Sequence, residues 1–224
     1  MSRAFRSALT IVAIAVGILC AHVSGQVAYQ RIVRAENEPS SWLTYSGSYR
    51  SQRYSALNQV NRQNVGQLKM AWAYQIKQSG LFEASPIVAD GIMFITEPPS
   101  TVTALDVRTG RPLWTWSPVI PPDVMTISAP SPVNRGVAVL DDMVFVGTVV
   151  GHLTALDAKT GALRWDTVVD DNKHAYFLTL APLALDGKII VRVRCGSGHS
   201  RLHRRVRCAR GPAALAPLDH SSTW

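Results

Sequence analysis

The feature that most constrains the fold is an internal repeat. The segment TALDVRTGRPLWTW, which begins at Thr103, recurs as TALDAKTGALRWDT from Thr154. Corresponding residues lie 51 positions apart, as the pair Trp114 and Trp165 shows. A period of about this length is typical of propellers and solenoids, in which each repeat is one supersecondary unit packed against its neighbours. The chain should therefore consist of similar units stacked side by side.

The sequence within each unit predicts four strands and no helix. SPIVADGIMFI contains two apolar runs joined by Asp90-Gly91, which is a strong hairpin signal. TVTALD alternates as a half-buried strand does, VRTG supplies a turn in which Gly110 can adopt a positive φ, and RPLWTW is a further strand. The second unit follows the same order, and a third opens with APLALDGKIIV. We therefore predict an all-β fold, a β-propeller of four-stranded antiparallel blades.

The predicted propeller is incomplete. A propeller closes with about four to eight blades, and residues 67–191 supply only about two and a half. Residues 26–66 form an N-terminal segment that leads into the first blade. QLKMAWAYQI, which contains Trp72, has the character of an isolated last strand of the kind with which many propellers close their ring. We interpret the repeated tryptophans as packing residues between blades rather than as cofactor ligands.

Residues 1–25 have the pattern of an export signal. Arg3 and Arg6 precede the uncharged apolar run Ala8–Cys20, and small residues stand before Gln26. The alternative is an N-terminal membrane anchor, but the run is too short to span a bilayer comfortably. We predict a periplasmic or secreted protein with no membrane span after cleavage of the signal peptide.

The positive charge is confined to the end of the chain. The formal net charge is +8, but residues 1–191 carry 16 Lys and Arg against 14 Asp and Glu, whereas residues 192–224 carry seven Arg against Asp219 alone. The body of the exported protein is thus nearly neutral, and the distribution gives no reason to expect a nucleic-acid partner.

The basic tail, residues 192–224, allows several interpretations. Cys195, His199, His203 and Cys208 approach a zinc-binding spacing, but an exported chain without a knuckle or helical framework makes zinc a poor interpretation. The tail has few aromatic residues for a nucleic-acid arm and no amphipathic period for a membrane surface. It begins in the middle of a strand, directly after DGKIIV, and its composition changes at once. We therefore expect an aberrant segment that is disordered or that arises from a frameshifted or misassembled end of the sequence.

Residues 42–76, WLTYSGSYRSQRYSALNQVNRQNVGQLKMAWAYQI, resemble the N-terminal segment of the pyrroloquinoline-quinone (PQQ)-dependent, or quinoprotein, alcohol dehydrogenases. The shared features are a W-x-x-Y start, the core RYSAL and the end NVGQLKMAW. The resemblance continues through FEASPIVADGIMFI, VNRGVAVLDDMVFVGT and LTLAPLALDGKIIV, and so covers residues 42–191. It implies an exported eight-bladed propeller that oxidises a small-molecule alcohol, passes the electrons to an acceptor, and holds PQQ near its axis beside a calcium ion.

The resemblance places three residues at quinone-contacting positions. Glu83 in FEASP matches a carboxylate that hydrogen-bonds the quinone, Arg135 in VNRG an arginine, and Thr179 in LTLAP a hydroxyl donor. The planar fork of an arginine suits a carboxylate of the quinone. The alternative for each is a polar residue that bonds only to neighbouring backbone.

The chain also departs from the family pattern. Ala129 and Pro130 stand where the family carries an adjacent Cys-Cys pair, and Ser197 stands where it has a calcium-binding glutamate. The second calcium ligand and the catalytic aspartate of the family lie beyond residue 224. We therefore expect this chain to bind neither PQQ nor calcium and to be inactive. Two other hypotheses stay open: a non-catalytic propeller scaffold of the cell envelope, and a product that does not fold stably.

The frameshift hypothesis makes a prediction about the gene. Another reading frame downstream of codon 191 should encode an S-G-x-E loop and then a further ALDxxTGxxxW, because the repeat runs without fault up to that point. DNA sequencing of the locus is the measurement, and the hypothesis fails if none of the frames encodes these two motifs.

Overall fold

The computed structural model describes residues 27–127, 133–170, 176–195, 203–207 and 215–217. The predicted signal peptide and the departures at Ala129, Pro130 and Ser197 lie outside these ranges. Within the described ranges, no helix has the length and apolar character that a membrane span requires.

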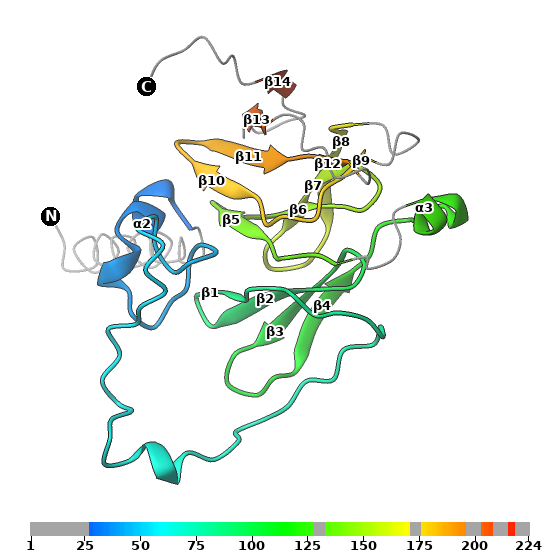
Figure 1. The fold of residues 1–224 in the computed structure, drawn as a ribbon. Helices are drawn as coiled ribbons and strands as arrows, with labels where there is room; N and C mark the ends of the chain where they lie inside the picture. The colour runs from blue at the N-terminus through cyan, green and yellow to red at the C-terminus, as the bar shows by residue number, and fades with distance from the viewer. Residues whose placement is uncertain (1–26, 128–132, 171–175, 196–202, 208–214, 218–224) are drawn as a thin grey trace, which may run out of the picture.

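The described strands form three four-stranded antiparallel sheets that stand side by side (Figure 1), which confirms the predicted incomplete propeller. In the first two sheets the strands are adjacent in the order of the chain. The first consists of β1 (Ile87–Ala89), β2 (Ile92–Glu97), β3 (Thr101–Asp106) and β4 (Pro112–Trp116). The second consists of β5 (Ala138–Leu140), β6 (Met143–Gly147), β7 (His152–Asp157) and β8 (Leu163–Val168).

The two complete blades have the same register. Phe94 of β2 faces Ala104 of β3, and Phe145 of β6 faces Ala155 of β7 at the equivalent place. The predicted hairpin turn after β1 is also present, with φ of 51° at Asp90 and 79° at the glycine that follows it. The 51-residue repeat in the sequence is therefore a repeat of backbone geometry.

The third sheet includes part of the basic tail. Its opening hairpin is the predicted one, but β13 pairs with β11, with Ile189 opposite Val206, and β14 completes the sheet. Two short segments after residue 192 thus continue the blade, while the origin of the tail in a shifted frame stays a prediction. The sheet consists of β10 (Leu183–Leu185), β11 (Lys188–Arg192), β13 (His203–Arg207) and β14 (Leu215–Pro217), beside the separate pair β9 (Tyr176–Phe177) and β12 (Arg194–Cys195).

The structure differs from the sequence prediction in the connecting segments. Residues 67–76, predicted as an isolated last strand, form no strand, because no described strand lies alongside to pair with their backbone. Short helices, which the repeat pattern did not predict, occur before and between the blades. They are α2 (Tyr29–Val33), the 3-10 turns η1 (Ala35–Asn37) and η2 (Val65–Gln67), and α3 (Pro122–Ile127).

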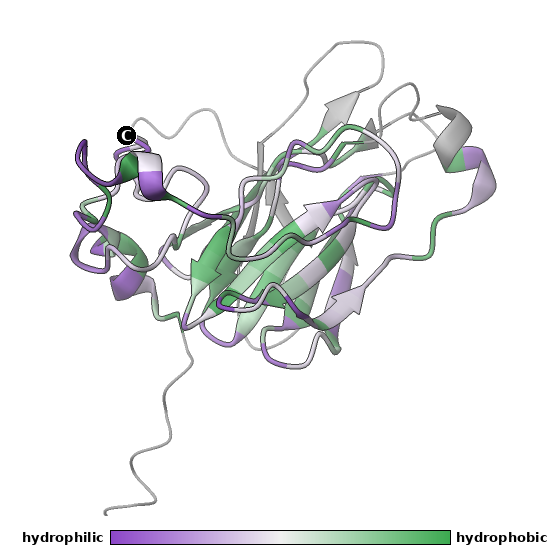
Figure 2. Ribbon diagram, turned by 90° about the horizontal axis from the view of Figure 1, so that it is seen from below, coloured by the Kyte–Doolittle hydropathy of each residue, from purple (hydrophilic) through white to green (hydrophobic). Residues whose placement is uncertain are grey.

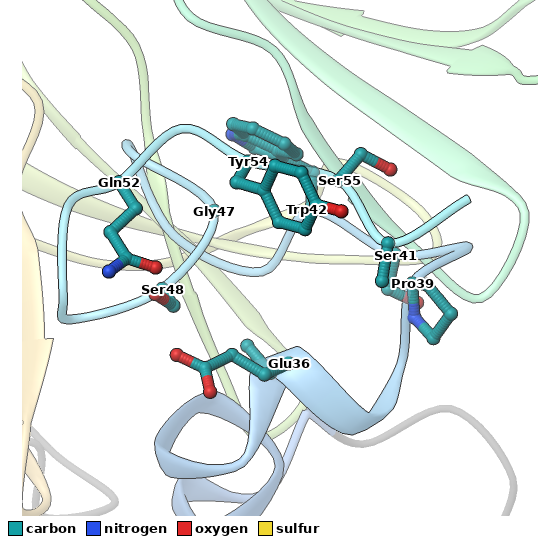
Figure 3. Close-up of a pocket in the computed structure, with 11 residues that line it drawn as sticks. Glu36, Pro39, Ser41, Trp42, Gly47, Ser48, Gln52, Tyr54 and Ser55 are labelled. Carbon is teal, nitrogen blue, oxygen red and sulfur yellow. The ribbon is translucent and has the colours of Figure 1, made fainter. Parts of the chain in front are cut away.

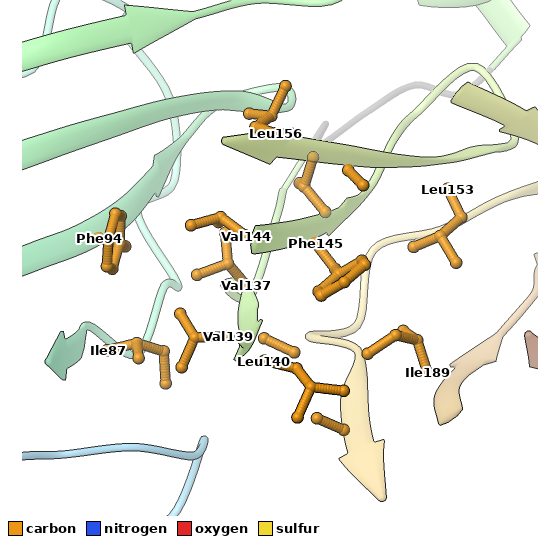
Figure 4. Close-up of a cluster of buried hydrophobic side chains, with 14 of the residues drawn as sticks. Ile87, Phe94, Val137, Val139, Leu140, Val144, Phe145, Leu153, Leu156 and Ile189 are labelled. Carbon is orange, nitrogen blue, oxygen red and sulfur yellow. The ribbon is translucent and has the colours of Figure 1, made fainter. Parts of the chain in front are cut away.

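The core lies between the sheets. Apolar residues concentrate along the strands, whereas the turns and the N-terminal helical segment carry most of the hydrophilic ones (Figure 2). Phe145 and Leu156 of the second blade are fully buried and share one cluster with Ile87 of the first blade and Ile189 of the third (Figure 4). Burial of such side chains stabilises a fold by about 1.5–3 kcal/mol each, so the cluster joins the blades into one unit.

A tryptophan joins each blade to the next. Trp114 of β4 packs on Gly161 in the turn of the second blade, and its indole Nε1 donates a hydrogen bond of 3.1 Å to the carbonyl of Ala158. Trp72 makes the same contact with Gly110 of the first blade. The segment before the first blade therefore occupies the place of a preceding blade's last strand, although it forms no strand itself.

Trp165, the third tryptophan of this series, makes no such bond. Its side chain is 8% exposed, yet its Nε1 has no hydrogen-bond partner in the described part of the chain. The Asp-x-x-Thr-Gly turn that receives Trp72 and Trp114 does not recur after residue 191 in the sequence.

The N-terminal segment is held against the inner strands. Val27 pairs with Asp141 and Trp42 with Val88 as isolated bridges. The guanidinium of Arg31 bridges Glu38 and Asp90 at 2.7 and 2.9 Å, and the hydrogen bonds with these carboxylates, chiefly that with Glu38, raise the pKa of Arg31. This contact fixes α2 to the first hairpin.

A buried carboxylate anchors the chain before the first blade. Glu97, at the end of β2, is 1% exposed and accepts hydrogen bonds from the hydroxyls of Tyr74 and Thr103 and from the amide of Lys77. These three donors satisfy a group that would be costly to bury alone. Residues 74–77 are thereby held on the first blade without strand pairing.

Substitution of Gly161 tests the packing between blades. A Cβ at this position would lie 2.6 Å from the ring of Trp114, and φ is +72°, so Gly161→Ala should lower the free energy of unfolding by about 2–4 kcal/mol in chemical denaturation. The matched control is Gly91→Ala, with φ of +79° and open space around a Cβ, which should cost only about 1–2 kcal/mol. Equal losses for the two variants would show that the tryptophan contact contributes nothing.

Candidate functional site

The structure brings the three predicted site residues together. Nη2 of Arg135 lies 2.7 Å from Oε2 of Glu83, and Nη1 donates a hydrogen bond of 3.2 Å to the hydroxyl of Thr179. Each residue comes shortly before the innermost strand of a different blade: β1, β5 or β10. The cluster therefore exists only when the three blades are packed side by side.

The backbones of the same loops are joined as well. The amide of Ser85 donates to the carbonyl of Arg135 at 3.2 Å, and the amide of Arg135 donates to the carbonyl of Thr179 at 3.0 Å. Because these bonds join neighbouring loops, they fix the positions of the Glu83, Arg135 and Thr179 side chains relative to one another. Arg135 is the central member of the row.

The triplet Asn134-Arg135-Gly136 is shaped by buried hydrogen bonds. Asn134 is 2% exposed; its Nδ2 donates to the carbonyl of Gly147 at 2.7 Å, and its Oδ1 accepts the amide of Gly136 at 3.1 Å. Gly136 has φ of +126°, and a Cβ there would lie 3.0 Å from the carbonyl oxygen of Ser85. The tight turn at Gly136 and the anchoring of Asn134 together orient the side chain of Arg135, which lies between them in the sequence.

A hollow of about 330 Å³ lies beside Arg135. Its walls come from the loop Thr44–Ser51 and from residues 180–183 at the start of the third blade. Tyr49 spans the two walls by donating its hydroxyl to the carbonyl of Ala184, and burial raises the pKa of Tyr49, so this hydroxyl stays protonated. The hollow therefore offers hydroxyl groups and one cation to a ligand.

The cluster has the chemistry of an anion-binding edge. The side chain of Arg135 is 26% exposed and that of Glu83 37%, whereas Thr179 is buried at 4%. A guanidinium has five N–H donors, and the contacts with Glu83 and Thr179 leave others for a ligand. This donor set fits one carboxylate-bearing edge of PQQ, which supplies a two-electron acceptor for alcohol oxidation when bound.

A calcium ion does not fit the described residues. Calcium takes six to eight oxygen ligands, usually including several carboxylates. The described parts of the chain hold no group of three or more His, Cys, Asp and Glu residues that could bind a metal. Glu83 is the carboxylate of the cluster, and it is already paired with Arg135.

Sequence reasoning overlooked the residues that support the cluster. Asn134 stands at the place in the second blade that Glu83 occupies in the first, 51 positions earlier, so the repeat carried a signal for it. Tyr49 carries no comparable signal, because its contact with Ala184 joins residues 135 positions apart.

Comparisons with known proteins show the family of this chain. Residues 42–201 match the family described as glucose/ethanol/alcohol dehydrogenase, β-propeller domain, of PQQ proteins. The chain belongs to this PQQ-dependent dehydrogenase family. The family resemblance drawn from the sequence is thus confirmed.

Members of the family among curated proteins are closely similar. The chain is 42% identical over 175 residues to the quinohemoprotein alcohol dehydrogenase ADH-IIG of Pseudomonas putida. The matched region covers 77% of this chain and 24% of that protein. It is 42% identical over 152 residues to a 1-butanol dehydrogenase (cytochrome c) of Thauera butanivorans, covering 67% and 22% of the two chains. The chain thus spans about a quarter of the length of these relatives.

Solved structures of PQQ-family enzymes have the same fold. The ADH-IIG structure from Pseudomonas putida superposes with a TM-score of 0.78 at 37% identity, over 86% of this chain and 28% of that one. A europium-containing methanol dehydrogenase superposes with a TM-score of 0.77 at 29% identity, over 84% and 34% of the two chains.

Substitution of Asn134 tests the support of Arg135. Asn134→Ala leaves the buried carbonyl of Gly147 and the amide of Gly136 without partners, so it should cost about 1–3 kcal/mol of unfolding free energy in denaturant titrations. Asn64 is the matched control, since it makes two similar bonds at an exposed site, and Asn64→Ala should change stability by about 0.5 kcal/mol or less. A loss at Asn134 no greater than that at Asn64 would contradict the proposed anchoring.

Proposed function

We propose that this chain is the N-terminal part of an exported PQQ-dependent alcohol dehydrogenase propeller, in which Glu83, Arg135 and Thr179 form one edge of the quinone site. The family supports oxidation of an alcohol to an aldehyde as the ancestral reaction. The observation that carries the proposal is the Arg135 cluster, in which three residues from three blades converge. Export to the periplasm or medium rests on the sequence pattern of residues 1–25.

In this site Arg135 would bind a carboxylate of the quinone, and Thr179 would donate its hydroxyl to the same edge. Glu83, whose Oε2 lies 2.7 Å from Nη2 of Arg135, balances the charge of the arginine before a ligand arrives. Arginine suits this role because its forked donors match both oxygens of a carboxylate. These residues would supply one edge of the quinone site, and we propose that the 224-residue form does not oxidise alcohols.

A non-catalytic propeller scaffold of the cell envelope is the second candidate. It is favoured by Ala129 and Pro130, which stand in the sequence where the family resemblance implies an adjacent Cys-Cys pair. The two candidates differ in one property, because only a dehydrogenase requires the quinone.

A chimaera separates them. Residues 1–191 joined to the remaining part of the Pseudomonas putida ADH-IIG protein should bind PQQ and reduce a dye in the presence of alcohol, whereas the 224-residue chain with PQQ and calcium should not. Arg135→Ala in the chimaera should weaken quinone binding about tenfold or more, because a charge-assisted bidentate contact is lost. The control Arg111→Ala, on an exposed turn of the first blade, should leave binding unchanged.

Three results would count against the proposal. Failure of the folded chimaera to bind quinone, while the parent enzyme binds it, would favour the scaffold. Unchanged quinone affinity in Arg135→Ala would remove the assigned site. Dye reduction by the 224-residue chain would show that this form is itself an enzyme.

A further inference from the structure

A second hollow lies in the N-terminal segment. It has a volume of about 330 Å³ and is lined by residues between Ala35 and Ala56, none of which belongs to the Arg135 cluster (Figure 3). In Figure 3 the rings of Trp42 and Tyr54 lie on one side, and the carboxylate of Glu36 lies across the hollow from them. Gln52 and small hydroxyl residues complete the walls.

The aromatic walls are available to a ligand. Trp42 is held from behind, since a Cβ at Gly47 would lie 3.0 Å from its ring, and its backbone is bridged to Val88 of β1. Tyr54 is 77% exposed, and its hydroxyl makes no hydrogen bond with the described residues. An aromatic ring attracts a cation over its face through the ring quadrupole, and two such rings line this hollow.

The charge of the residues that line the hollow also favours a cation. Glu36 is the one Asp, Glu, Lys or Arg residue among those that line it. Its Oε1 lies 3.3 Å from Nε of Arg50, but both side chains are largely exposed, at 49% and 72%. An exposed pair of this kind contributes about 1 kcal/mol or less, so a cation in the hollow can compete with Arg50.

A metal ion does not suit these walls. One carboxylate and several neutral oxygens leave a divalent cation with too few charged ligands. A cation with an apolar surface, by contrast, can contact both rings and keep its charge near the carboxylate.

We propose that this hollow, formed by Trp42, Tyr54 and Glu36, binds a small organic cation of the methylated-ammonium class. This function is separate from the proposed quinone edge, and neither depends on the other. The rings contact the methylated head, and Glu36 balances its charge.

Choline is the probe for the experiment. Its methyl protons are followed by ligand-observed NMR during titration with the complete 224-residue chain, and saturable binding is expected. The neutral carbon isostere of choline, in which a tert-butyl group replaces the trimethylammonium group, should bind about tenfold more weakly, because both the ring contacts and the carboxylate favour a cation.

Variants at exposed positions locate the site without unfolding it. Tyr54→Ala and Glu36→Gln should each weaken choline binding about two- to fivefold. The matched controls are Leu57→Ala, an apolar side chain 46% exposed in the same segment, and Asp186→Asn, an exposed carboxylate paired with Lys188. Both controls should bind choline as the parent chain does, and thermal unfolding curves should be alike for all five proteins.

Each of three outcomes would overturn the proposal. The first is the absence of saturable choline binding. The second is equal affinity for the neutral isostere, which would make the hollow an alcohol or general apolar site. The third is equal affinity in the Tyr54 and Glu36 variants and their controls, which would place the bound choline elsewhere.

Discussion

An indole ring laid on a glycine turn, with its N–H bonded to a carbonyl of that turn, sets the spacing between neighbouring blades. Trp114 makes this contact with Gly161, and Trp72 makes it with Gly110. The contact requires glycine for two reasons: the backbone has a positive φ, and a Cβ would clash with the indole ring. The buried cluster between the sheets and the contacts among the inner loops depend on this spacing.

The candidate quinone edge depends on that spacing. Arg135 reaches Glu83 on one neighbouring loop and Thr179 on the other, and no single blade contains more than a part of the cluster. A side chain contributed by one blade thus meets its partners only through packing between blades. This is why residues far apart in the sequence can form one cluster.

The sequence was sufficient for the parts of the structure that repeat. Asp90 and Asp186 mark their hairpins, and the positions of Trp114 and Gly161 follow from the period. It was insufficient where a contact joins non-repeating elements. The anchoring of residues 74–77 by Glu97 and the contact of Tyr49 with Ala184 depend on three-dimensional packing that no local pattern encodes.

In residues 192–224 the structure contains strands that the sequence did not predict. Its composition gave no strand signal, yet β13 pairs with β11, because an open strand edge accepts backbone partners largely independently of their side chains. Pairing of β13 with β11 gives the buried Nε1 of Trp165 no hydrogen-bond partner within the described residues. Backbone pairing can extend a sheet, but the turn that receives a tryptophan requires a specific sequence.

The central claim is that packing of tryptophan on glycine between blades holds the inner loops together. Amide hydrogen exchange of Ser85, whose N–H bonds to the carbonyl of Arg135 on the next blade, tests this claim directly in the Gly161→Ala protein. Exchange at Ser85 should become about tenfold faster or more, while amides within the β2–β3 ladder keep their protection. Unchanged exchange at Ser85 would show that the inner loops are held together without the tryptophan contact, and would contradict the account.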